Sequence, residues 1–333
     1  EEENPPYWTV LSSCTNGDCS VLTNYGIVNF YVGSLAMNSS TITNYGEMNF
    51  NNTDLTMTGI SATSSKVAHF INYGKVNMTN SSLRVQDRYT QLHNTDGSMW
   101  VIDNSASSYS KSVYFDGCEF NLDDPNAFVS LDCGSTFYVK NSNVVIYYGK
   151  LSSTANVDGN FIVENGNLAV RKKDDGGGTF TIEQNCGKMY IIDTDGSGDD
   201  GLLTMEPANG GGGTFNVGGV LYATGIVGGK GSGDSFNIKD GGFVFIGNLG
   251  ATTPAYQWEY AINVETGGIL HYCGNRTATA DLVGSVDGKL YYASNYYQNG
   301  ASDPDSEGDF VTHGDNYFPE YATMVECIGA FEA

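Results

Sequence analysis

A short motif that repeats without gaps constrains the fold of this chain more than any other feature. Its copies occupy residues 23–30, 43–50 and 71–78. Each copy contains Asn-Tyr-Gly, and the residue after this glycine varies freely, as Ile27, Glu47 and Lys75 show. The positions one and three residues further on stay apolar. Such alternation predicts a short strand with one face in an apolar interior and the other in solvent.

A second apolar pair follows the first at a constant spacing of seven residues, as Leu35 follows Val28. The two pairs, with a turn between them, recur at Phe137/Val139 with Val144/Ile146, Phe161/Val163 with Leu168/Val170, Phe236/Ile238 with Phe243/Phe245, and Ile262/Val264 with Ile269/His271. A further apolar residue precedes the first pair at Leu22, Ile42, Phe70 and Leu131. We therefore expect three short strands per unit, each directing apolar side chains inward.

The unit advances by twenty residues from Leu22 to Ile42, which is too short for a repeat of two packed helices. The sequence thus predicts an all-β, right-handed parallel β-helix, a β-solenoid with capped ends and coils about 4.8 Å apart. The expected divisions are an N-terminal tail and cap at 1–20, solenoid coils at 21–292 and a C-terminal cap segment at 293–333. We expect Asn24, Asn44 and Asn72 to adopt the left-handed conformation and to form a hydrogen-bonded ladder.

The Leu-Thr-Asn-Tyr-Gly-x-Val pattern that starts at Leu22, followed by Leu-x-Met at Leu35, resembles the coils of filamentous-haemagglutinin-type adhesins. More loosely, it is similar to the right-handed parallel β-helices of the pectin-lyase-like class. The resemblance spans about residues 20–292 and implies the architecture of bacterial surface adhesin-like proteins. Such repeats arise by convergence, so a shared fold does not carry a shared function.

Charge and the first residues indicate where the protein acts. The chain has 38 acidic and 15 basic residues, a formal charge of -23, which repels phosphate backbones and argues against nucleic acid as a partner. No apolar run reaches the ~20 residues of a transmembrane helix. The start, Glu1 to Pro6, resembles the tether of Bacteroidetes surface lipoproteins, so we expect a secreted or outer-surface protein with a lipid anchor upstream of residue 1. An unstructured acidic tail is the alternative.

The seven cysteines are too scattered for a disulfide framework in a chain of this length. Cys14 and Cys19 flank turn-forming residues, which favours a small disulfide in the N-terminal cap. Cys133, Cys186 and Cys273 each precede a glycine, and we interpret them as small packing residues at comparable repeat positions. Zinc is not expected, because no Cys-x-x-Cys pair occurs.

The sequence identifies no catalytic residue. β-Helix enzymes that act on acidic polysaccharides need clustered carboxylates beside a cation, but arginine is scarce and the histidines stand alone. His271 is interpreted as a buried structural histidine. The leading hypothesis is a non-enzymatic adhesin-like protein that binds a glycan or a host surface protein. The alternatives are a polysaccharide lyase or glycoside hydrolase, in which Asp132, Asp158 and Asp193 converge in three dimensions, and a structural stalk module.

Two weaker signals concern ligands. Asp193, Asp195 and Asp199 alternate with small residues like the first half of a calcium loop, so Ca²⁺ is the one cofactor considered. A solvated insertion is the other reading, because Thr204 stands where such a loop has its bidentate glutamate.

The aromatic residues of the C-terminal third supply candidate ligand-binding side chains, with a cap as their alternative role. These candidates are Trp258, Tyr296 and Tyr297.

Overall fold

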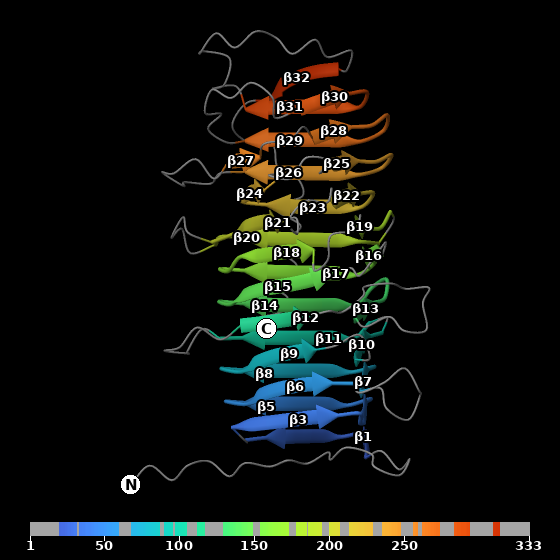
Figure 1. The fold of residues 1–333 in the computed structure, drawn as a ribbon, viewed down its shortest axis with the longest axis vertical. Coiled ribbons are helices and arrows are strands. Elements are labelled where there is room, and N and C mark those ends of the chain that lie inside the picture. Colours follow the sequence, from blue (N-terminus) through green and yellow to red (C-terminus); the bar gives the residue numbers. More distant parts are fainter. Residues whose placement is uncertain are drawn as a thin grey trace.

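The structure is a computed structural model, and it shows an all-β solenoid of stacked parallel strands (Figure 1). It describes residues 20–31, 33–59, 68–86, 90–95, 97–104, 112–116, 129–148, 154–172, 178–184, 186–194, 200–206, 213–228, 235–247, 256–258, 262–273, 283–293 and 309–313. Within these ranges every regular element is a strand, and no helix could cross a membrane. The predicted fold class is thereby confirmed.

The chain enters most coils on one side of the solenoid, where its strands form two separate sheets. Sheet I contains β1 (Val21–Asn24), β4 (Thr41–Asn44), β7 (Ala68–Asn72), β10 (Thr90–Asn94) and β13 (Val129–Leu131). Sheet IV continues this side with β16 (Thr154–Val157), β19 (Gly178–Ile182), β22 (Gly213–Val217), β25 (Ser235–Ile238), β28 (Ile262–Val264) and β30 (Val283–Val286).

The second side is one continuous 12-stranded sheet, sheet II. Its strands are β2 (Ile27–Phe30), β5 (Glu47–Asn51), β8 (Lys75–Thr79), β11 (Met99–Asp103), β14 (Thr136–Lys140), β17 (Asn160–Glu164), β20 (Lys188–Ile192), β23 (Val220–Ala223), β26 (Phe243–Gly247), β29 (Ile269–Cys273), β31 (Lys289–Ala293) and β32 (Asp309–His313). Every neighbouring pair in this sheet is parallel, as the stacking of successive coils requires.

The third side is a nine-stranded sheet, sheet III. It contains β3 (Ser34–Asn38), β6 (Asp54–Thr58), β9 (Ser82–Gln86), β12 (Ser112–Asp116), β15 (Asn143–Tyr148), β18 (Leu168–Lys172), β21 (Leu202–Glu206), β24 (Gly225–Gly228) and β27 (Tyr256–Trp258). A coil therefore contributes one strand to each of three sides, which is the arrangement that the three apolar positions per unit predict.

Apolar side chains of the three sides meet in one interior core. Register pairs Phe30 with Phe50 and Phe50 with Met78, and the rings of Phe30 and Phe50 stack 4.7 Å apart. The parallel row of Val28, Met48 and Val76 forms in the same way. The two apolar positions that the repeat predicts to face the interior thus form two stacked rows there, and these rows bury surface that a single coil could not bury alone.

The predicted asparagine ladder is also confirmed, but its backbone conformation differs from the expectation. Asn24, Asn44 and Asn72 each donate an amide hydrogen to the next asparagine of the row, ending on Asn94, over 2.8 Å. None of the four has a positive φ. Left-handed asparagines instead occupy the other corner of the coil, between sheets II and III, at Asn52, Asn80, Asn141 and Asn165. At the corner between sheets I and II the asparagines of the ladder keep ordinary φ values, and the left-handed residues there are glycines, Gly97 and Gly134.

Two apolar pairs predicted for the later coils are displaced by one residue. Val244 and Ile246 face the core, whereas Phe245 belongs to a separate apolar cluster on the outward face of sheet II. Leu270 is likewise in the core, and His271 pairs in register with Phe245. The backbone register thus puts His271 in the row of Phe245 and not in that of Leu270, which contradicts its predicted inward position, while the His271 side chain itself lies outside the described part of the structure. The error arises because β26 is apolar at every residue from 243 to 246, so alternation alone cannot identify the buried face.

Candidate binding surface

The corner between sheets I and II is built by three residues with different tasks. Buried Asn44 fixes the bend, because its side-chain amide donates to the Oδ1 atom of Asn72 at 2.8 Å and to the carbonyl oxygen of Lys75 at 3.0 Å. Gly46 allows the next coil to approach, since a Cβ atom there would collide with the carbonyl oxygen of Gly26. The intervening Tyr45 is consequently directed to the outside, where it is 47% exposed.

Because the motif repeats, the outward tyrosines stack. The ring centroids of Tyr25 and Tyr45 lie 4.9 Å apart at 3°, and those of Tyr45 and Tyr73 lie 4.7 Å apart at 8°. We call these three residues the tyrosine corner. Its ring faces contact one another, so it presents a row of ring edges and hydroxyl groups to solvent, together with the outer face of Tyr25, which is 77% exposed.

Exposed apolar side chains concentrate in the same region. Within the described ranges, the large exposed hydrophobic residues are Val21, Tyr25, Ile27, Tyr31, Tyr45 and Tyr73. Four of them belong to the first coil, where Val28 and Phe30 of the interior are also only partly buried. An apolar surface rimmed by polar groups is the usual mark of an interaction site.

A row of amides lies beside the tyrosine corner on sheet II. Asn49 donates to the Oδ1 atom of Asn29 at 2.9 Å, and Asn77 donates to the Oδ1 atom of Asn49 at 2.7 Å. Asn77 also lies 3.3 Å from a carboxylate oxygen of Glu47. The surface thus combines ring edges, hydroxyl groups, amides and the carboxylate of Glu47.

A second group of polar residues lies further along the same edge of the solenoid. The Nε2 atom of His93 is 3.0 Å from the Oδ1 atom of Asp132, which follows β13. Asp158, in the corner after β16, has a pKa raised by burial and, second, by the charge of Asp132. Coil stacking therefore brings Asp132 and Asp158 together as predicted, but Asp193 follows β20 at the opposite end of a sheet II strand.

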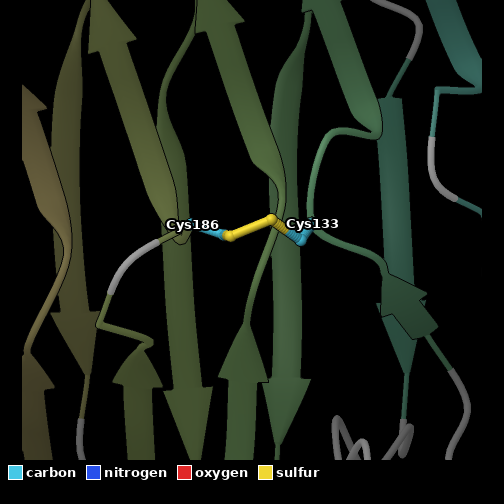
Figure 2. The surroundings of a disulfide bond; sticks show 2 residues. All are labelled: Cys133 and Cys186. Carbon is cyan, nitrogen blue, oxygen red and sulfur yellow. A yellow bond between two sulfur atoms is a disulfide. The ribbon is translucent and has the colours of Figure 1, made fainter.

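The disulfide between Cys133 and Cys186 corrects the interpretation of both residues as packing side chains (Figure 2). Their corners are separated by one intervening coil, so a spacing of about 4.8 Å per coil would put them nearly 10 Å apart. The Cα atoms are nevertheless 5.2 Å apart. The intervening corner has only Asp158 and Gly159 between its strands, whereas the flanking corners, residues 132–135 and 183–187, are longer and so have the length to meet across it.

The sequence-predicted ligand and metal residues can be located only in part. Trp258 ends β27, but its side chain, like Tyr296 and Tyr297, lies outside the described part of the structure. Asp193 is described and its backbone amide donates to Thr224, whereas Asp195 and Asp199 fall outside the described residues, as do Cys14 and Cys19. Among the described residues no three His, Cys, Asp or Glu side chains are grouped as metal ligands would be.

The tyrosine corner is the feature that sequence reasoning overlooked. The signal was present, since a tyrosine occupies the same place in all three copies of the motif. The repeat alone does not show that the tyrosine is exposed. Its exposure follows from the burial of the asparagine before it and from the close contact that the glycine after it makes with the neighbouring coil.

Comparison with known proteins gives no relative from which a role can be transferred, because the chain matches no protein-family model, no curated protein and no solved structure.

Proposed function

We propose that this chain is a non-enzymatic, adhesin-like binding protein of the cell surface or the extracellular space. The observation that carries the proposal is the tyrosine corner, an exposed aromatic row held on a rigid backbone. Aromatic side chains fixed in this way bind at low cost in conformational entropy, because their positions are set before the ligand arrives. The ligand class is a glycan or a protein of another cell surface.

Charge narrows the ligand class further. With a formal charge of -23, the protein repels acidic polysaccharides at long range. Beside the tyrosine corner lie the uncharged amides of Asn29, Asn49 and Asn77, and the two charged neighbours, Glu47 and Lys75, are of opposite sign. A neutral ligand rich in hydroxyl groups therefore suits this surface better than an anionic one.

The disulfide supports a location outside the cytoplasm. Cys133 is exposed and Cys186 partly exposed, so reducing agents have access to the bond. Exposed disulfides persist in oxidising compartments and are rare in the reducing cytosol. A secreted or outer-surface protein fits this chemistry.

Binding can be tested on a glycan array and on intact cells with the full chain. We expect Tyr25→Ala/Tyr45→Ala to lose at least tenfold in apparent affinity, whereas Gln184→Ala, which changes an exposed side chain in a distant coil, retains binding. Binding that survives the double substitution would reject the tyrosine corner as the site. The absence of any ligand on arrays and cells would favour a structural stalk.

A polysaccharide lyase or glycoside hydrolase is the second candidate function, because Asp132 contacts His93 and is close enough to Asp158 for its charge to influence that carboxyl group. A carboxyl group with a raised pKa can act as a general acid. Reducing-sugar and unsaturated-product assays on neutral and acidic polysaccharides test this candidate. Turnover that disappears in Asp158→Asn but persists in Tyr25→Ala would establish an enzyme and overturn the non-enzymatic proposal.

A further inference from the structure

One row of side chains changes character along the outward face of sheet II. Strand pairing joins its members in the order Asn29, Asn49, Asn77, Val101, Tyr138, Ile162, Tyr190, Tyr222 and Phe245. The first three are amides that hydrogen-bond one another. From Val101 to Phe245 the row is entirely apolar or aromatic, and beyond Phe245 the pairing continues through His271, Tyr291 and Val311. We call the five residues from Tyr138 to Phe245 the outer apolar row.

Every side chain of the outer apolar row is buried. Tyr138 and Tyr222 are 2% exposed and Ile162 is 1% exposed, although all three lie on the face that points away from the core. They form an apolar cluster of their own, separate from the interior. On a bare sheet face such side chains would be open to water, so another part of this chain covers them.

The chain beyond the last strand has the sequence pattern of a suitable cover. After Pro319, the residues Tyr321, Met324, Ile328 and Phe331 follow one another at intervals of three, four and three residues. That spacing places apolar residues along one face of a helix. Pro319 would be the first residue of such a helix, and proline is favoured at that position.

We propose that the outer apolar row is the docking surface for the chain's own C-terminal segment, residues 314–333, with its apolar stripe lying along the side of the solenoid. The segment then covers sheet II rather than the end of the last coil. This inference is independent of the proposed binding function.

The lengths agree with this placement. β32, where the segment begins, lies three strands from β26 in sheet II, a distance of about 14 Å at ~4.8 Å per strand. The five residues 314–318 can span about 16 Å when extended. Residues 319–331, as a helix, would extend about 20 Å at 1.5 Å per residue. The row from β26 to β14 crosses four strand spacings, or about 19 Å.

A substitution on the stripe tests the docking in the full chain. Ile328→Asp should lower the midpoint of urea unfolding and raise the fluorescence of an apolar-surface dye such as ANS several-fold, because the outer apolar row becomes accessible to water. Glu326→Lys is the matched control, since residue 326 lies on the opposite face of the same helical pattern and should leave both measurements unchanged. Equal results for the two variants would overturn the proposal.

A double-mutant comparison separates docking on the side from capping of the end. Tyr190 lies in the middle of the row, five strands from β32. If Ile328 docks near it, Tyr190→Asn adds little to the loss already caused by Ile328→Asp, whereas a segment that covers only the last coil gives additive losses. Additivity would reject the side placement. Removal of residues 314–333 should reproduce the dye binding of Ile328→Asp, and a truncated protein with the dye binding of the wild type would also reject it.

Discussion

At the scale of single residues, the repeat uses the same residue type for opposite purposes on its two faces. Asn44 is fully buried and supplies hydrogen bonds to groups that water cannot reach, whereas Asn49, five residues later, lies in an outer row that is open to solvent. The cost of losing either amide depends on this difference, because a buried partner left without a hydrogen bond loses its solvation as well.

Replacement of Asn44 by alanine should therefore be strongly destabilising. The substitution removes the donor to Asn72 and Lys75 and the acceptor for Asn24, so several buried groups lose a partner. We expect a loss of about 2–4 kcal/mol in the free energy of unfolding, from the usual cost of buried unsatisfied groups. Asn49→Ala should cost less than about 1 kcal/mol. Urea unfolding of both variants measures the difference, and equal losses would contradict the role of the buried ladder.

Asp158 should make stability depend on pH. Burial and, second, the charge of Asp132 raise its pKa in the folded protein above the value of about 3.9 for an unfolded chain. The folded protein then binds this proton more tightly, so the contribution of Asp158 is fully present below the unfolded pKa and is lost as pH rises through the folded pKa. Asp158→Asn should accordingly raise the melting temperature at pH 7 but not near pH 3.

The matched control for this titration is Asp287→Asn. Asp287 precedes a glycine in a corner between β30 and β31, just as Asp158 precedes Gly159 between β16 and β17. Melting curves from pH 3 to pH 7 compare the two substitutions, and the gain at pH 7 should be larger for Asp158→Asn, because burial and the charge of Asp132 raise the pKa of Asp158. If the two substitutions gave the same pH profile, the effect would reflect the overall negative charge and not the neighbourhood of Asp132.

At the scale of strands and corners, sequence patterns predicted the early coils well because polar and apolar positions alternate there. Ile42, Met48 and Phe50 all face the core as expected. Prediction failed by one residue in β26, where apolar residues occupy both faces of the strand. The candidate site shows the same limit: Asp132 and Asp158 could be suspected from coil stacking, but their proximity depends on corner geometry that alternation does not encode.

The glycines of the first corner offer a test of coil stacking itself. A Cβ atom on Gly46 would collide with the backbone of Gly26 in the preceding coil, whereas a Cβ atom on Gly26 meets no described atom within 4 Å. Gly46→Ala should therefore lower the melting temperature by several degrees, and Gly26→Ala should leave it nearly unchanged. Thermal unfolding followed by circular dichroism compares the two. Similar losses would mean that the glycines serve local turn conformation and not close approach between coils.

At the scale of the whole molecule, the disulfide lies where the solenoid is discontinuous. Sheet II runs through all of the coils, but the side that precedes it changes from sheet I to sheet IV between β13 and β16. The bond joins the corner after β13 to the corner after β19, and so crosses this break.

The sequence alone could not identify Cys133 and Cys186 as a pair, because their pairing depends on the short corner of the intervening coil. In a solenoid, where each coil contacts only its neighbours, such a break is the natural place for partial unfolding.

Loss of the disulfide should therefore weaken this break more than the rest of the solenoid. The bond closes a sequence separation of 53 residues, for which the chain-entropy model gives about 4 kcal/mol of stabilisation. We expect Cys133→Ser/Cys186→Ser to lose up to that amount and to exchange amide hydrogens faster in β13 and β16 than in β5 and β8. A reducing agent should bring the wild type to the stability of the double variant and leave the variant itself unchanged. If exchange became faster to the same extent along the whole solenoid, the bond would stabilise the entire stack and not the break in particular. Cooperative unfolding of all coils exposes every strand together, which produces that uniform pattern.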